Sequence, residues 1–231
     1  MIKYYIIQWE SVSTLRMRKK PNLESRLAKC APVCPAEPEK MRGKWKGSFG
    51  FERICIEIGC GKGRFITETA KNDEKTLFIG IEREQGALVM AMEKAMKQEI
   101  KNVRFLDVDA ERLCEIFEDG EIDGIYLNFS DPWPKKKQAK RRLTHGDFLA
   151  RYDKVLSGDG FLYFKTDNSK LFEFSLNSMS EYGLRLRNIT FDLAASGIPN
   201  VVTEYEARFM EQGMNIYRVE AYKPSGSILR T

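Results

Sequence analysis

The chain has 231 residues, of which 42% are hydrophobic and 31% are charged. A chain of this length can bury a full hydrophobic core as one domain. The sequence has no run of about 18 apolar residues that could cross a bilayer. Its apolar start, MIKYYIIQWE, lacks the basic region and cleavage site of a secretory signal, so we expect a cytoplasmic protein.

The net charge of +5 is unevenly distributed along the chain. Residues 15–47 contain ten Lys or Arg and three Glu, and residues 135–142 contain six Lys or Arg and no acid. The remainder of the chain is therefore acidic. Two concentrated cationic segments on an acidic body favour a polyanionic partner, such as nucleic acid, over an ordinary solvated surface.

Five cysteines at irregular spacing do not form the pattern of a disulfide framework, and we expect reduced thiols. Cys30 and Cys34 could supply two metal ligands, but the single histidine, His145, is distant in sequence. A structural zinc site usually has four ligands. The sequence thus predicts no metal site.

The N-terminal part of the chain differs in composition from the rest. Residues 30–47 contain three prolines and two glycines, which is typical of an extended segment. We expect residues 1–48 to form a basic, flexible arm. The ordered core is predicted to begin near Phe49, with residues 49–231 as one α/β domain.

From Phe49 onward, apolar runs of strand type alternate with helical patterns. Strands are predicted at 53–58, 76–82, 102–109, 122–131 and 160–167, helices at 64–72, 86–99, 113–117, 146–156 and 169–183, and further strands at 184–193 and 215–222. Strand and helix alternating five times predict a doubly wound, mostly parallel sheet with helices on both faces.

Three predicted strands end in groups that could bind a nucleotide, because ligands of such sheets lie beyond the carboxyl ends of the strands. The loop after the first strand contains Gly59, Gly61 and Gly63, which let the backbone approach a ligand. The second strand ends in Glu82, placed to bind ribose hydroxyls. The third leads to Asp107 and Asp109, where an acceptor could meet an adenine amino group.

The residues around the glycine loop distinguish between two cofactors. A dinucleotide fingerprint has a third glycine or alanine where this chain has Arg64. Glu57, just before the loop, would repel a pyrophosphate but suits a ligand that has an ammonium and a sulfonium group. We therefore expect S-adenosylmethionine rather than NAD.

The fourth strand ends in Asp131, which is followed by Pro132, Trp133 and Pro134. The two prolines restrict the backbone around them, so the carboxylate and the indole ring are expected to be held in place. A Ser-Asp-Pro turn is the simpler interpretation, but the adjacent cations and the glycine loop favour a functional one. The segment resembles the Asn/Asp-Pro-Pro-aromatic motif of methyltransferases that act on exocyclic amines, with Trp133 replacing the second proline.

A narrower resemblance follows from five segments in order: EIGCGKGRFI, IGIERE, SDPWPKKKQAKRRL, FKTDN and TEYEARF. Together they resemble the bacterial tRNA (guanine-N7)-methyltransferase family over roughly residues 15–222, so that residues 1–14 lie outside the pattern. EQGMNIYRVEA departs slightly from it. The resemblance implies a class I methyltransferase fold, whose seven-stranded sheet has an antiparallel strand near the C-terminus. It also implies methyl transfer from S-adenosylmethionine to N7 of a guanine in the variable loop of tRNA.

The resemblance implies roles for individual residues as well. The cofactor-binding positions match Glu57, Glu82, Asp109 and Asp131, beside the three glycines, and Asp131 is also the proposed catalytic residue. The substrate contacts match Lys135, Asp167, Thr203, Glu204, Tyr205 and Glu206. The tRNA-contacting strip matches Lys137, Gln138, Ala139, Lys140, Arg141 and Arg142.

The chemistry of this reaction fits the same residues. Guanine N7 has an in-plane lone pair, so its methylation needs no general base, and the enzyme mainly has to hold N7 in line with the methyl group. We expect Asp131, alone or with Asp167 or Glu206, to accept hydrogen bonds from guanine N1 and N2. A carboxylate there would stabilise the positive charge that develops on the base.

Several alternatives stay open from the sequence. Trp133 either packs beneath Asp131 or stacks on a base. Tyr205 is expected to be exposed or to face the substrate, and His145 is expected to be a helix cap or a surface residue. The competing functions are a nicotinamide-dependent oxidoreductase, a non-catalytic RNA-binding module, and methylation of an exocyclic amine. The oligomer, monomer or homodimer, is likewise open.

Overall fold

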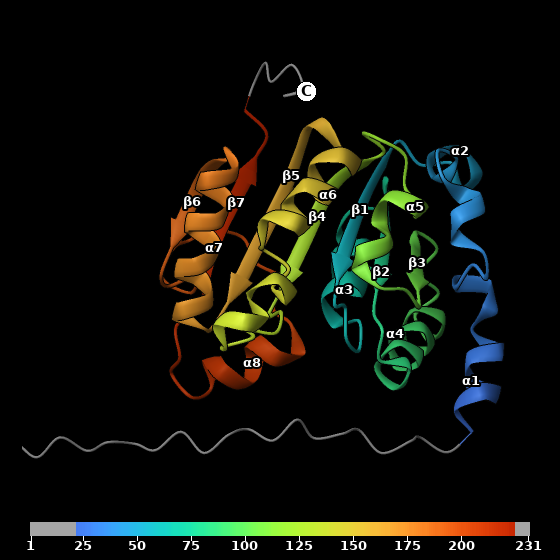
Figure 1. Ribbon diagram of the computed structural model, residues 1–231. Helices are drawn as coiled ribbons and strands as arrows, with labels where there is room; N and C mark the ends of the chain where they lie inside the picture. Colours follow the sequence, from blue (N-terminus) through green and yellow to red (C-terminus); the bar gives the residue numbers. More distant parts are fainter. Residues whose placement is uncertain (1–21, 225–231) are drawn as a thin grey trace, which may run out of the picture.

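The computed structural model describes residues 22–224, which form one seven-stranded sheet with helices on both faces (Figure 1). The strands are β1 (Arg53–Ile58), β2 (Thr76–Ile81), β3 (Val103–Leu106), β4 (Ile122–Asn128), β5 (Leu156–Thr166), β6 (Arg185–Thr190) and β7 (Tyr217–Tyr222). The α-helices are α1 (Leu23–Lys29), α2 (Trp45–Phe49), α3 (Arg64–Asn72), α4 (Gln85–Lys97), α5 (Leu113–Ile116), α6 (Gly146–Val155), α7 (Ser169–Tyr182) and α8 (Glu204–Met210). Short 3-10 helices are η1 (Ala31–Val33), η2 (Pro38–Met41), η3 (Ala110–Arg112) and η4 (Lys136–Arg141).

The strands lie in the order β3-β2-β1-β4-β5-β7-β6. Strands β1 to β5 are parallel, and β7 is antiparallel to both β5 and β6. The strand order reverses between β1 and β4, so their carboxyl ends form the switch point at which ligands of such sheets bind. The predicted mostly parallel, seven-stranded sheet with an antiparallel strand near the C-terminus is confirmed.

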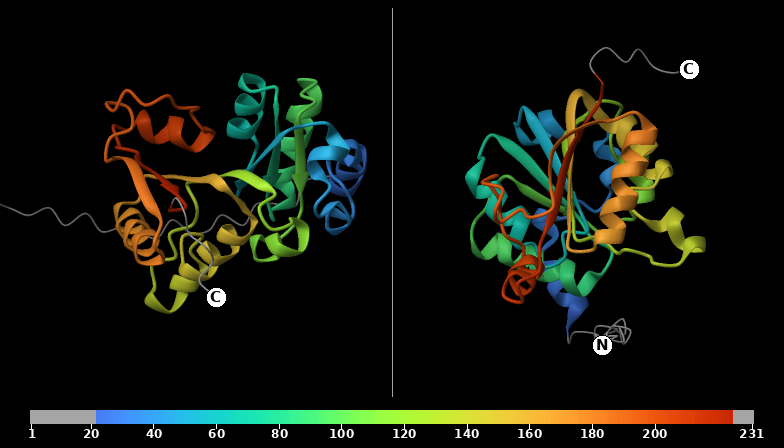
Figure 2. Two further views of the ribbon diagram at one scale, coloured as in Figure 1. Left: turned by 90° about the horizontal axis from the view of Figure 1, so that it is seen from above. Right: turned by 90° about the vertical axis from the view of Figure 1, so that its left-hand side faces the viewer.

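The parallel strands are buried on both faces, which explains their continuous apolar runs. Ile54 and Ile56 face a core shared with α5, α6 and α7, whereas Cys55 between them faces a second core shared with α3 and α4. Figure 2 shows the helices on either side of the sheet. Because both faces are filled by apolar side chains, the polar groups of a site gather at the strand ends.

Most predicted strands and helices are present, with ends shifted by a few residues. Strand β5 is longer than predicted, and helix α8 is additional. Strand β5 begins at Leu156 rather than at residue 160, because Leu156 already pairs with Ile122 of β4 before a register shift. Helix α8 was not among the predicted elements. Its start has a capping box, in which Thr203 and Glu206 exchange hydrogen bonds, and this pattern is visible in the sequence TEYE.

The ordered core begins before the expected start at Phe49. Trp45 is fully buried, its ring packs against that of Phe117, and its indole N–H donates a 3.1 Å hydrogen bond to the Ile116 carbonyl. Trp45 therefore belongs to the same core as β1. The division of the chain into an arm (1–48) and a domain (49–231) stays a prediction, and residues 1–21 lie outside the described part of the chain.

Four cations of the described N-terminal segment, Arg26, Lys40, Arg42 and Lys46, pair with acids. Arg26 binds Glu93 of α4 at 2.6 Å, Arg42 binds Glu118 at 3.7 Å, and Lys46 binds Asp123 of β4 at 3.0 Å. These pairs fasten α1, η2 and α2 along the β3 side of the sheet (Figure 1). Within residues 22–48, much of the positive charge is thus paired with acidic side chains of the same protein.

The remaining features of the described residues concern membranes, thiols and metals. Between residues 22 and 224, no helix has the length and apolarity needed to cross a membrane. All five cysteines are free thiols. The same residues contain no group of three His, Cys, Asp or Glu that could hold a metal ion.

Candidate active site

The loop between β1 and α3 brings the backbone to open space at the carboxyl end of β1. Gly59 (φ 80°) and Gly61 (φ 53°) have left-handed backbone, and a Cβ atom at either position would meet no other atom within 4 Å. Gly63 (φ 77°) differs, because its Cβ would lie 2.6 Å from the Cβ of Ala91 on α4. Gly59 and Gly61 leave room for a ligand, whereas Gly63 allows α3 to pack closely on α4.

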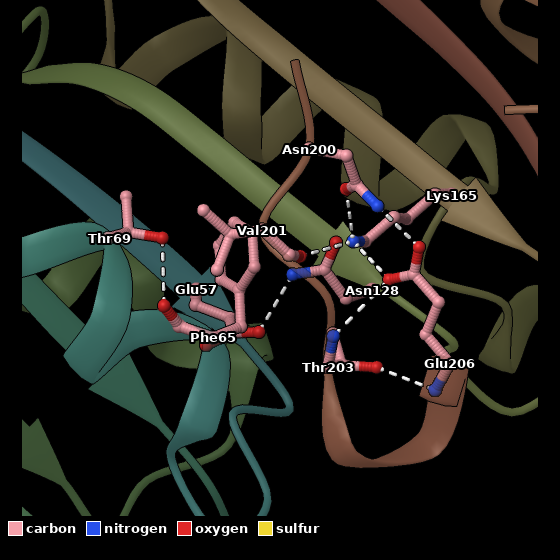
Figure 3. A network of polar contacts seen from close by, with 9 residues as sticks. All are labelled: Glu57, Phe65, Thr69, Asn128, Lys165, Asn200, Val201, Thr203 and Glu206. Carbon is pink, nitrogen blue, oxygen red and sulfur yellow. Dashed lines mark hydrogen bonds and ion pairs between the residues drawn. The ribbon is translucent and has the colours of Figure 1, made fainter. Parts of the chain in front are cut away.

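Glu57 brings a carboxylate to the end of β1. Its side chain is buried, with 3% exposure, and accepts a 2.8 Å hydrogen bond from the Asn128 amide at the end of β4 (Figure 3). Because β1 and β4 are neighbours in the sheet, this bond joins the two strand ends at the switch point. Asn128 was not among the sequence-predicted site residues.

Glu82 follows β2 and fixes the glycine loop. Its carboxylate accepts hydrogen bonds from the backbone N–H of Gly61 at 3.0 Å and from that of Glu84 at 2.9 Å. Glu84 in turn caps the N-terminus of α4. The position of the loop after β1 is therefore set by a side chain from the next strand.

Asp109 and Asp107 follow β3 but have different surroundings. Asp109 caps η3 by accepting from the Glu111 N–H, and it binds the Arg83 guanidinium at 2.5 Å. Burial raises the pKa of Asp109, but these two hydrogen bonds and the positive charges of Arg83 and Arg151 outweigh burial, so its pKa lies below the usual range. Asp107 is exposed and accepts a 2.7 Å hydrogen bond from Gln85.

A cavity of about 390 Å³ lies at the carboxyl ends of these strands. Four carboxylates line it: Glu82, Asp109 and Asp131 follow β2, β3 and β4, and Glu111 lies in η3. Further lining residues are Gly59, Arg83, Asn128, Phe129, Trp133 and Arg141. Asp107 is not among the lining residues. The prediction that acids from several strand ends gather at one place therefore agrees with the structure for Glu82, Asp109 and Asp131.

Trp133 lies at the mouth of this cavity and is half-buried. The guanidinium carbon of Arg141 lies 3.5 Å from the centroid of its ring, a cation–π contact. Trp133 thus neither fills the hydrophobic core nor stands free. It joins the Asp131 loop, residues 129–134, to the cationic segment that follows.

A second hollow, of about 250 Å³, adjoins the first. Both hollows are lined by Gly59, Asn128 and Phe129, so they form one groove along the strand ends. The second part of the groove is also lined by Glu57, Gly61, Lys62, Thr203 and Tyr205. This groove brings the glycine loop of β1 next to the C-terminal segment that contains α8.

A buried ion pair holds the segment before α8 against β5. Lys165 is 4% exposed, and its ammonium donates to Asn200 Oδ1 at 2.9 Å, the Val201 carbonyl at 2.9 Å and Glu206 Oε2 at 2.6 Å (Figure 3). These three bonds use all three N–H donors of the ammonium. Burial lowers the pKa of Lys165 against the attraction of Glu206.

The residues of TEYE have different placements. Thr203 caps α8, and Glu206 is 1% exposed with its carboxylate bonded to Lys165, Asn200 and the Thr203 backbone. Tyr205 is 47% exposed, and its ring lies 5.2 Å from that of Phe129. The side chain of Glu204 lies outside the described part of the structure. Tyr205 thus faces the groove, as expected, while Glu206 supports the segment from within.

Asp167 is the predicted site residue that directly follows β5. Burial raises the pKa of Asp167. The pKa of Tyr205 is raised first by burial and then by the negative charges of Asp167 and Asp131. The charges of both carboxylates therefore act on the Tyr205 phenol, which lines the groove.

The cationic segment forms η4 directly after the Asp131 loop. Lys135, Lys136, Lys137, Lys140 and Arg141 are exposed, whereas Gln138, Ala139 and Arg142 are half-buried. His145 caps α6 by accepting from the Asp147 N–H at 3.2 Å, as predicted. The strip therefore begins beside the groove and continues on the surface of the molecule.

Sequence reasoning missed Arg83, Asn128, Lys165 and Asn200. Asn128 and Lys165 lie within recognised segments, but no local pattern tells that their partners are Glu57 and Glu206, which are 71 and 41 residues away. Such pairs arise only when the strands are placed side by side.

Comparison with known proteins finds a matching family and proteins of similar sequence. Residues 52–219 match the model of a protein family described as "Putative methyltransferase". The chain is 50% identical over 212 residues to a tRNA (guanine-N(7)-)-methyltransferase of Geobacillus thermodenitrificans, covering 91% of this chain and 98% of the relative. It is 46% identical over 208 residues to a tRNA (guanine-N(7)-)-methyltransferase of Bacillus subtilis, covering 89% and 98%.

Solved structures share the fold at low sequence identity. An antibiotic-related methyltransferase aligns with a TM-score of 0.60 at 22% identity, covering 78% of this chain and 92% of that one. A SAM-dependent methyltransferase from Aquifex aeolicus aligns with a TM-score of 0.51 at 16% identity, covering 87% and 98%. These similarities concern the arrangement of the sheet and helices alone.

Proposed function

This chain belongs to the tRNA (guanine-N7)-methyltransferase family, and we propose that its substrate is a guanine in the variable loop of tRNA. The enzyme transfers a methyl group from S-adenosylmethionine to N7 of that guanine and gives N7-methylguanosine. A cytoplasmic location fits a protein that acts on tRNA.

The observation that supports this function best is the acidic groove beside the cationic strip. Glu82, Asp109 and Asp131 line the cavity at the strand ends, and Arg141 lies over Trp133 at its mouth. Clustered carboxylates suit a cationic methyl donor, and neighbouring lysines and arginines suit RNA phosphates. A nicotinamide dinucleotide would instead bring its pyrophosphate close to these acids.

The residues present fit S-adenosylmethionine. The open space in front of Gly59 and Gly61 is what a bound ligand needs, since a side chain at either position would fill it. We assign Glu57, Glu82, Asp109 and Asp131 to cofactor binding, with Gly59 and Gly61, whereas Gly63 acts through helix packing. When bound, the cofactor supplies an electrophilic methyl group next to a positive sulfur.

The protein's part in the reaction is mainly to position the base. Asp131 is exposed after the end of β4, and its charge and that of Asp167 both act on Tyr205. We assign Asp131 as the acceptor for guanine N1 and N2 donors, with Asp167 beside it and Tyr205 as a contact to the base. A carboxylate held there stabilises the positive charge that the purine gains.

The cationic strip has the separate task of binding tRNA. Lys135, Lys137, Lys140 and Arg141 are exposed next to the groove and can reach phosphates, which fixes the position of the RNA without reading its sequence. Gln138 and Ala139 lie between these cations in η4. A non-catalytic RNA-binding module would have no use for the acidic groove beside them.

Identification of the modified nucleoside tests the proposal directly. A tRNA transcript is incubated with the enzyme and S-adenosylmethionine, digested to nucleosides and analysed by mass spectrometry against standards. We expect N7-methylguanosine, and a transcript whose variable-loop guanine is replaced by adenine should gain none. A product methylated on an exocyclic amine, or unchanged yield from the replaced transcript, would contradict the proposal.

A further inference from the structure

We propose that Arg142 is a positioning residue, which holds the Asp131 loop in shape, while the other cations of the strip bind RNA. The inference rests on the proposed function in one respect, namely that Asp131 acts on the base. Its structural part, the dependence of the loop on Arg142, can be measured without any substrate.

The Asp131 loop has an unusual backbone. Phe129 (φ 54°) and Trp133 (φ 40°) both have positive φ, a conformation that residues with a side chain rarely adopt. Asp131 lies between them, and Pro132 and Pro134 further restrict the chain. A loop of this kind keeps its shape only when surrounding groups hold it.

Arg142 provides such a group. Its Nε donates to the Pro132 carbonyl at 3.0 Å, and its Nη2 donates to the Trp133 carbonyl at 3.0 Å. These two carbonyls lie on either side of Trp133, so one rigid guanidinium fixes both peptide planes next to the positive φ. Because the donor is charged, both bonds are stronger than ordinary backbone bonds.

Arg142 is itself held from three sides. Its guanidinium carbon lies 4.3 Å from the centroid of the Phe174 ring on α7. Its backbone N–H donates to the Ala139 carbonyl at 3.0 Å, and its carbonyl accepts from the His145 N–H at 2.9 Å. The loop that presents Asp131 is thereby connected through one residue to η4, to His145 at the start of α6, and to α7.

The neighbouring cations differ in their surroundings. Lys140 is exposed, as are Lys135 and Lys137, whereas Arg142 is half-buried with two donors directed at the loop. A phosphate would have to compete with the two carbonyls for those donors. The strip therefore contains two kinds of cation, and Arg142→Gln and Lys140→Gln form a matched pair that removes one charge of each kind.

Hydrogen exchange on the free protein tests the structural part. We expect the peptide that covers residues 127–135 to exchange about tenfold faster in Arg142→Gln than in the wild type, and at the wild-type rate in Lys140→Gln. Arg142→Lys, which offers a point charge in place of the planar fork, should be intermediate, and it is measured if Arg142→Gln fails to fold. Equal exchange of this peptide in the wild type and the Arg142 variants would overturn the proposal.

Kinetics test its consequence for the reaction. In Arg142→Gln we expect the single-turnover rate at saturating tRNA and cofactor to fall by more than tenfold, with the salt dependence of tRNA binding unchanged. In Lys140→Gln we expect a raised KM for tRNA and a weaker salt dependence. If Arg142→Gln instead behaved as Lys140→Gln does, Arg142 would be an ordinary RNA contact. Absence of N7-methylguanosine from the wild-type reaction would refute the proposed function but leave the exchange result intact.

Discussion

The acids assigned to cofactor binding have neighbours that set their positions. Glu57 is bonded to Asn128, Glu82 to the loop at Gly61, and Asp109 to Arg83. The loop of Asp131 is held by Arg142, which donates to the Pro132 and Trp133 carbonyls. The carboxylates are therefore preorganised, which is what electrostatic stabilisation of a developing charge requires.

Asp131→Ala should lower the rate of methyl transfer itself. We expect the single-turnover rate at saturating tRNA and cofactor to fall by about 100-fold, the usual effect of removing one preorganised group. Rapid-quench measurement with labelled S-adenosylmethionine separates this rate from binding. A rate equal to that of the wild type would remove Asp131 from catalysis.

Asp109 and Asp107 form a matched pair for cofactor binding, because Asp109 alone of the two lines the cavity. Asp109→Asn should weaken S-adenosylmethionine binding by about tenfold, which corresponds to ~1.4 kcal/mol. Asp107→Asn should leave the Kd close to that of the wild type. Calorimetric titration of both variants provides the comparison, and a larger effect of Asp107→Asn would reverse the assignment.

The raised pKa of Asp167 predicts that kcat falls on the acidic side of its pH profile. Burial raises its pKa, so as pH falls the carboxylate is protonated at a higher pH than an ordinary Asp, whose value is about 3.9. Its role as an acceptor is present above that raised pKa and lost below it. We expect kcat to decline with falling pH in the wild type. Asp167→Asn should have a lower, flatter profile, and a wild-type limb retained in this variant would assign the limb to another group.

At the scale of elements, α8 is held by side chains rather than by the sheet. Residues 191–216 connect β6 to β7 without joining a strand, and long connections of this kind are commonly functional. Lys165 on β5 binds Asn200, Val201 and Glu206 from this connection. The position of Tyr205 over the groove therefore depends on one buried ammonium.

Lys165→Met should destabilise the protein by about 3–5 kcal/mol, because Glu206 then stays buried without its partner. Glu206→Gln should also destabilise, and the double variant should lose less than the sum of the two. Urea unfolding of all three variants gives the coupling. Additive losses would show that the 2.6 Å pair contributes nothing of its own.

At the scale of the whole molecule, the cations of the two basic segments have different surroundings. Within residues 22–48, Arg26, Arg42 and Lys46 pair with acids of the body, whereas the cations of 135–141 are exposed beside the groove. The two cationic segments of the sequence are therefore not equivalent. Only the second presents, within the described residues, a row of exposed cations next to the site.

Lys140 and Lys154 form a matched pair that tests this distinction. Both are exposed, but Lys140 lies in η4 within the cationic strip, whereas Lys154 lies in the last turn of α6, outside the strip. Lys140→Gln should reduce the slope of log affinity against log salt by about 0.7–0.9, the effect of one lost phosphate contact. Lys154→Gln should leave the slope unchanged. Binding of tRNA measured over a salt series decides it, and equal slopes in both variants would assign the strip to an ordinary solvated surface.

The sequence predicted the order of strands and helices because local patterns encode them. The apolar run RICIEI is strand β1, and RFITETAKN is helix α3, each with the predicted bounds. The acids that follow buried strands could be placed at one edge for the same reason, since parallel strands end together. Elements with weak local patterns were missed, namely α1, α2 and α8, and so was the early start of the core at Trp45.

The sequence by itself determined the fold class, the family and the acids at the strand ends, because these follow from periodicity and from short contiguous motifs. Only the tertiary structure decided what each group does there. It showed that Gly63 packs against Ala91, that Glu206 holds a segment from within, and that Arg142 binds the loop of Asp131. The physical reason is that these roles depend on partners across the fold or across a turn, whose distance and direction no local pattern encodes.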